Sequence, residues 1–232
     1  MEERKDTRQN QNCKNNRFLL FCAMFFRDQH IDAIIFDLGG VILNIDYHLP
    51  VQAFKALGID DFSSHFSQAA QSTLLDDYET GRISSEAFIE EVAKFVKPGT
   101  TEVQIRAAWN SILLDLPEER LFCLEKAAEN NRIFLLSNTN EIHIEEFNRY
   151  LLNSHSIPSL EPFFEKLYLS YEIGLRKPER QIFEYVLADA GLDPKTTLFI
   201  DDSFQHIQAA QSLGIVSHHL LNEDICTLLD ES

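Results

Sequence analysis

Three short apolar runs along the chain share one design, in which hydrophobic residues end abruptly at polar ones. The runs are 33–36, 133–136 and 198–200, and they end at Asp37, at Ser137-Asn138 and at Asp201-Asp202. Runs this short and this uniformly apolar are typical of strands buried on both faces. Weaker patterns of the same kind at 167–170 and 215–219 indicate two further strands.

Helical stretches separate these strands. They cover 117–130, 141–152, 178–190 and 204–213. Strands that alternate with helices predict an α/β fold, with a parallel sheet flanked by helices. The carboxyl ends of parallel strands meet at one edge of such a sheet, and ligands bind there. We therefore expect Asp37, Ser137 and Asp201 to share one crevice.

The segment between the first two strands is far longer than a simple crossover needs. It shows no strand pattern and is expected to be helical at about 50–57, 62–78, 84–97 and 101–113. We interpret it as a small helical domain inserted over the crevice. We expect a poorly ordered N-terminal extension at residues 1–30. The core domain is expected at 31–46 and 117–232, and the helical cap domain at 47–116.

The balance of charge narrows the range of partners. The 232 residues include 20 Lys and Arg against 37 Asp and Glu, for a formal net charge of -17. The resulting potential repels polyanions, so nucleic acid is not an expected partner. A site for a small phosphorylated ligand must then supply its own local cations, such as a metal ion and a lysine.

The cysteines and the N-terminal segment bear on the compartment. Cys13, Cys22, Cys123 and Cys226 form no CxxC pair, metal-ligand spacing or dense framework, so we expect reduced thiols in a cytoplasmic protein. The apolar run 18–26 is too short to span a bilayer and is not followed by a small-residue cleavage site. Neither a membrane anchor nor a signal peptide is expected. Met24 suggests the hypothesis that translation starts there, which would make the preceding residues an upstream extension.

Four short motifs follow one another in a fixed order, each at an expected strand end or helix start. They are Phe36-Asp37-Leu38-Gly39-Gly40-Val41, Leu136-Ser137-Asn138-Thr139-Asn140, Arg176-Lys177-Pro178-Glu179 and Ile200-Asp201-Asp202. Together they resemble the four motifs of the haloacid dehalogenase superfamily, over roughly residues 32–222. The fold implied is a Rossmann-like core, and the insertion after the first motif resembles the helical C1-type cap of that superfamily.

The resemblance implies a Mg²⁺-dependent phosphatase that hydrolyses small phosphomonoesters through an aspartyl-phosphate intermediate. Asp37 would be the nucleophile, and Lys177 would supply positive charge beside it. Mg²⁺ would be held by the Asp37 carboxylate, the Gly39 carbonyl, Asp201 and Asp202. The substrate phosphate would lie against Gly39, Gly40, Ser137, the Asn138 amide and Lys177.

One position departs from the pattern of that superfamily. Its common phosphatase sequence has a second aspartate two residues after the nucleophile, as general acid, and here that residue is Gly39. Losing a general acid typically costs about 10²- to 10⁴-fold in rate. Either another residue must donate the proton, or the leaving group must need little protonation. Asp46 and His48 are the candidates for a substitute proton donor. Sugar 1-phosphates offer such a leaving group, and the sequence is similar to a glucose-1-phosphatase-like subgroup that carries the same glycine.

Two alternatives remain open at this stage. A 2-haloacid dehalogenase also lacks the second aspartate, although the pair Asp201-Asp202 argues for a metal that dehalogenation does not need. A catalytically silent module that binds Mg²⁺ and phosphorylated ligands is supported only by Gly39. His206 also differs from the asparagine frequent in relatives, and capping or orienting its helix is the simplest role for it. The expected ligand is a small phosphorylated metabolite, bound by a monomer or a homodimer.

Overall fold

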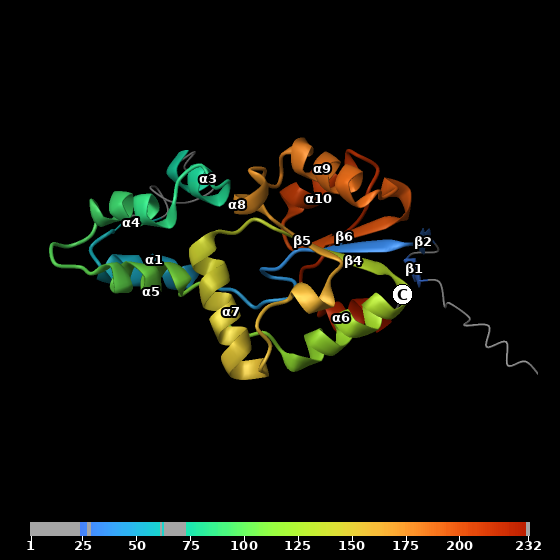
Figure 1. Ribbon diagram of the computed structural model, residues 1–232, viewed down its shortest axis with the longest axis horizontal. Helices are drawn as coiled ribbons and strands as arrows, with labels where there is room; N and C mark the ends of the chain where they lie inside the picture. Colours follow the sequence, from blue (N-terminus) through green and yellow to red (C-terminus); the bar gives the residue numbers. More distant parts are fainter. Residues whose placement is uncertain (1–23, 27–28, 61, 63–72, 231–232) are drawn as a thin grey trace, which may run out of the picture.

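Five parallel strands form the centre of the protein (Figure 1). The computed structural model describes residues 24–26, 29–60, 62 and 73–230. The sheet has the order β5-β4-β3-β6-β7. Its strands are β3 Ala33–Phe36, β4 Arg132–Ser137, β5 Lys166–Leu169, β6 Thr197–Asp201 and β7 Val216–His219. The predicted α/β fold with a parallel sheet is confirmed.

The register of the central strands places their polar ends side by side. Phe36 of β3 pairs with Leu135 of β4 and with Ile200 of β6. The next backbone amide, that of Asp37, donates to the Ile200 carbonyl at 2.9 Å. Strand β4 lies on one side of β3 and β6 lies on the other. The strand order therefore reverses beside β3, and ligands bind at such a switch point, at the carboxyl ends of the strands.

Helices cover both faces of the sheet, which explains why its strands are apolar throughout. Helices α6 Glu118–Asn130, α7 Glu141–His155 and α11 Ile225–Asp230 pack with Ile34 and Phe36. Helices α9 Arg180–Ala190 and α10 Phe204–Gln211 pack with Ala33 and Ile35 on the other face (Figure 1). A short helix, α8 Ser170–Ile173, follows β5. No helix within the described residues is both long and apolar enough to cross a membrane.

A short hairpin precedes the sheet. Strand β1, Met24–Phe26, pairs antiparallel with β2, Gln29–Ile31. Phe26 and Ile31 are buried in the core beside Ile34. Residues 24–26 and 29–30 of the expected extension thus belong to this hairpin, where burial of Phe26 against the core stabilises it. The rest of the expected extension lies outside the described residues.

The inserted segment forms a helical unit at one side of the sheet (Figure 1). Its helices are α1 His48–Ala56, α3 Thr73–Glu79, α4 Ser85–Ala93 and α5 Glu102–Asn110. Of the helix expected at 62–78, the part at 63–72 lies outside the described residues. The unit has its own hydrophobic cluster, built around Phe54, Phe88 and Trp109. This separate cluster supports a cap domain, whose boundaries at 47 and 116 stay predictions.

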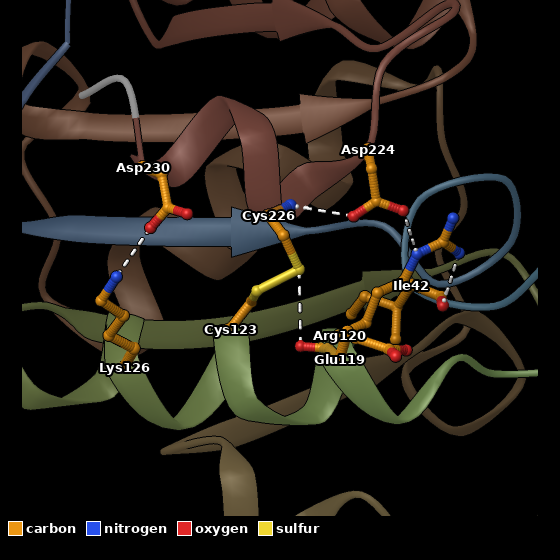
Figure 2. Close-up of a disulfide and its surroundings, with 8 residues drawn as sticks. All are labelled: Ile42, Glu119, Arg120, Cys123, Lys126, Asp224, Cys226 and Asp230. Carbon is orange, nitrogen blue, oxygen red and sulfur yellow. Dashed lines mark hydrogen bonds and ion pairs between the residues drawn. A yellow bond between two sulfur atoms is a disulfide. The ribbon is translucent and has the colours of Figure 1, made fainter.

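A disulfide joins Cys123 of α6 to Cys226 of α11 (Figure 2). Beside it, the Arg120 guanidinium donates to Asp224 at 2.9 Å and to the Ile42 carbonyl at 2.9 Å (Figure 2). The expectation of reduced thiols is thus wrong for these two cysteines, because helices far apart in the sequence bring them together. Disulfides persist mainly in oxidising compartments, so the thiol argument for a cytoplasmic location no longer holds.

We predict that Cys226→Ser lowers the free energy of unfolding by about 2–4 kcal/mol, because the bridge closes a long loop in the unfolded chain. The two cysteines are 103 residues apart. Urea unfolding with and without a reductant measures the effect. The reductant should move the wild-type midpoint down towards that of the variant and leave the variant unchanged. Equal midpoints for the variant and the oxidised wild type would contradict the prediction.

Candidate active site

A buried lysine joins the ends of two strands. Lys177 Nζ lies 2.8 Å from Asp37 Oδ1, just after β3, and 2.7 Å from Asp201 Oδ2, at the end of β6. It also donates to the Leu136 carbonyl at 2.9 Å. The side chain is 0% exposed. Burial alone would lower the pKa of Lys177, but Asp201 and Asp37 raise it above its ordinary value, so the ammonium stays charged.

Asp37 is held in a defined orientation. Its Oδ1 accepts a hydrogen bond from the Leu38 amide at 2.8 Å, in addition to the contact with Lys177. The net pKa of Asp37 is raised to about 7, mainly because the side chain is buried. Asp201 and Asp202 add to this rise, and Lys177 opposes it. A carboxylate that attacks an electrophile must be ionised. A further cation near Asp37 would therefore favour the reactive form.

Asp201 is fixed by three groups. Its Oδ1 accepts from the Ser203 amide at 2.7 Å, and its Oδ2 contacts Lys177. The His206 ring Nδ1 lies 2.9 Å from Oδ1 and 3.0 Å from Oδ2. Burial raises the pKa of Asp201, but Lys177 and His206 outweigh it, and the net shift is downward. His206 therefore orients the Asp201 carboxylate, a contact that its sequence position alone did not reveal.

These side chains fit a divalent cation. One ligand atom each from Asp37, Asp201 and His206 lies within 4.8 Å of the others. Asp202 approaches the loop after Asp37 so closely that a Cβ at Gly40 would lie 2.3 Å from its Oδ2. Carboxylate and carbonyl oxygens are the ligands that Mg²⁺ prefers. Asp37 and Asp201 could hold the ion, and the predicted participation of Asp202 and the Gly39 carbonyl stays a prediction.

A cavity of about 370 Å³ opens beside Asp37. Most of the expected phosphate-binding residues line it, namely Gly39, Ser137, Asn138 and Lys177. The Asn138 side chain is occupied, because it donates to the Lys177 carbonyl at 2.8 Å and accepts from the Lys177 amide at 2.8 Å. It thus positions the lysine, while its backbone amide stays the predicted phosphate donor. Gly40 does not line the cavity, and its lack of a side chain instead admits Asp202.

The cap contributes residues that the sequence did not single out. Tyr47, before α1, and Glu79, at the end of α3, line the same cavity. The two expected acid substitutes do not, since neither Asp46 nor His48 is among the described residues that line it. Instead Asp46 Oδ1 accepts from the His48 amide at 2.8 Å, at the start of α1. Carboxyl groups are rarely buried, so the burial of Glu79 indicates a functional residue. The sequence alone could not show this, because the burial arises only in the folded chain.

Comparison with known proteins gives consistent similarities. A family model described as haloacid dehalogenase-like hydrolase matches residues 31–214. The D-ribitol-5-phosphate phosphatase of Bacteroides thetaiotaomicron is 30% identical over 184 residues, which are 79% of this chain and 89% of that protein.

Two solved structures are also similar. A HAD family enzyme of Bacteroides thetaiotaomicron, in complex with magnesium and inorganic phosphate, has a TM-score of 0.76 and 37% identity, over 84% of this chain and 96% of that one. A predicted HAD-like family hydrolase of Porphyromonas gingivalis has a TM-score of 0.77 and 32% identity, over 87% of this chain and 99% of that one.

We predict that Lys177→Met destabilises the metal-free protein by about 3–5 kcal/mol, because it leaves two buried carboxylates without their cation. Urea unfolding in the presence of a chelator, at mildly alkaline pH, measures the loss. Lys166→Met is the matched control, since Lys166 forms an exposed pair with Asp189 at 2.7 Å. That variant should lose little stability, because solvent screens the pair. Equal losses in the two variants would show that Lys177 has no special role in stability.

Proposed function

The chain belongs to the haloacid dehalogenase-like hydrolases, and we propose that it is a Mg²⁺-dependent phosphatase of small phosphorylated sugars or sugar alcohols. Asp37 is its nucleophile and carries the phosphoryl group as an aspartyl phosphate. The main support is the position of Lys177, which holds Asp37 and Asp201 together at the edge of the cavity. Phosphoryl transfer depends on such positioning and on nearby positive charge.

Each residue has a defined task in this reaction. An Asp37 carboxylate oxygen attacks phosphorus while the bond to the leaving oxygen breaks. The Ser137 hydroxyl and the Asn138 amide donate hydrogen bonds to the phosphate oxygens, and Lys177 offsets the negative charge. Water then attacks the aspartyl phosphate and regenerates Asp37. When bound, Mg²⁺ supplies the positive charge that draws the phosphate to these carboxylates.

The size and lining of the cavity support a small substrate. Its volume of about 370 Å³ lies in the range of pockets for small molecules. Polar groups from the strand ends lie on its core side, and Tyr47, Ile112 and Leu113 add surface from the cap and its junction with the core. The name of the Bacteroides relative, a D-ribitol-5-phosphate phosphatase, supports a sugar or sugar alcohol as the esterified group.

A preference for sugar 1-phosphates stays a narrower prediction. It follows only if no other group replaces the acid that is missing at Gly39. The relative named for ribitol 5-phosphate favours a primary phosphate ester, whose leaving oxygen needs a proton more strongly. The identity of the proton donor therefore decides which esters the enzyme prefers.

We predict that the protein releases phosphate from a panel of sugar and sugar alcohol phosphates with Mg²⁺, and that a chelator abolishes the release. Asp37→Asn should lower kcat by about 10³-fold or more, because the amide cannot attack phosphorus. A colorimetric phosphate assay measures both effects, and 2-chloropropionate serves as the control substrate, with no halide release expected. Halide release without phosphate release would favour a dehalogenase. If the wild type binds phosphate esters but is no more active than the variant, the silent binding module is correct.

A further inference from the structure

A cap carboxyl reaches the active-site cavity without a hydrogen-bond partner of its own. Glu79 is the last residue of α3 and lines the cavity together with Asp37 and Gly39. Its side chain is only 13% exposed. Its Oε2 has no hydrogen-bond partner among the described residues. The ion pair with Arg176 offsets part of the cost of burying this oxygen, and its unused hydrogen-bonding capacity is available to a ligand.

Two contacts dock this end of α3 against the core. The Arg176 guanidinium, next to Lys177 in the chain, forms ion pairs with Asp76 and Glu79, both on α3. Its Nη2 lies 3.0 Å from Glu79 Oε2 without forming a hydrogen bond. After Glu79 the chain turns at Gly81, where a Cβ would lie 2.1 Å from the Tyr171 carbonyl oxygen. Only glycine permits this approach, so the turn after Glu79 packs closely against the core.

The surroundings of Glu79 keep its carboxyl close to the point of ionisation at neutral pH. Burial raises the pKa of Glu79 to about 8, and Lys177 opposes this shift. Arg176 of the core and Asp76 of its own helix lie near it, and Tyr47, Asp37, Asp202 and His206 line the same cavity. A group with a pKa near the working pH serves well as a general acid and then as a base.

We propose that Glu79 is the general acid that replaces the aspartate missing at Gly39, an assignment that rests on the phosphatase function proposed above. As Asp37 attacks phosphorus and the ester P–O bond breaks, the Glu79 proton passes to the leaving oxygen, which departs as a hydroxyl. In the second step, water attacks the phosphorus of the aspartyl phosphate. Its proton passes to the Glu79 carboxylate, while Asp37 leaves as a carboxylate and inorganic phosphate is formed.

The test compares two esters that differ in their need for a proton. One is the best alkyl phosphate from the panel, such as ribitol 5-phosphate, and the other is p-nitrophenyl phosphate, whose phenolate leaves unprotonated. The quantity compared is kcat/KM, which reports the steps up to departure of the leaving group and not the hydrolysis of the aspartyl phosphate that both esters share. In Glu79→Gln, kcat/KM for the alkyl ester should fall about 10²-fold or more. For p-nitrophenyl phosphate, kcat/KM should stay close to the wild-type value. An equal loss for both esters, or no loss for the alkyl ester, would overturn the assignment.

Asp76→Asn is the matched control, because it removes the other carboxylate that pairs with Arg176 but leaves Glu79 in place. It should change the turnover of both esters by the same factor. Selective loss of alkyl ester turnover in this variant would mean that docking of the cap, and not a proton from Glu79, governs the leaving group. A wild type that hydrolyses neither ester would instead overturn the phosphatase function, and this assignment with it.

The wild type alone provides a second measurement, which does not depend on how a variant folds. Since a general acid must be protonated, kcat/KM for the alkyl ester should fall as the pH rises through the pKa of Glu79, which is about 8 in the free protein. The profile for p-nitrophenyl phosphate should lack this decrease. Identical profiles for the two esters above neutral pH would contradict a role for Glu79 in proton transfer.

Discussion

The active site depends on one buried ammonium group. Lys177 is removed from water, and the carboxylates of Asp37 and Asp201 compensate for its lost hydration. That arrangement requires β3 and β6 to end at the same level, which their parallel register provides by pairing Phe36 with Ile200. The uniform apolar strands are therefore more than a core, because their pairing sets the distance between the charges.

The dipeptide Arg176-Lys177 connects the two parts of the molecule. Lys177 contacts the carboxylates of the core, and Arg176 contacts Asp76 and Glu79 of the cap. Helix α7 of the core makes a second connection, since Ile142 belongs to the hydrophobic cluster of the cap. The charge beside the nucleophile and the docking of the cap thus lie on neighbouring residues. A cap that docks in this way brings Glu79 to the same cavity as Asp37. In the proposed reaction, residues of the core bind and transfer the phosphoryl group, and Glu79 of the cap protonates the leaving group.

The sequence predicted what depends on local pattern, namely the buried strands, the helices between them and the polar residues at the strand ends. It could not predict contacts that depend on how distant segments pack. The pairing of Cys123 with Cys226 has no local signature, because the two residues meet only when α6 and α11 pack together. Asp46 and His48 are close to Asp37 in the chain but do not line the cavity, whereas Glu79 is distant in the chain and does line it, because α3 docks there.

The charges in the site explain why such an acidic protein needs a metal ion to act on phosphate esters. Asp37, Asp201 and Asp202 together outnumber Lys177, whose ammonium already pairs with two of them. A phosphate that entered this cavity without a further cation would meet net negative charge, in a protein whose formal charge is -17. A bound Mg²⁺ would offset the remaining negative charge of these groups and would also favour the ionised form of Asp37. Metal binding and substrate binding are therefore coupled through the same three carboxylates.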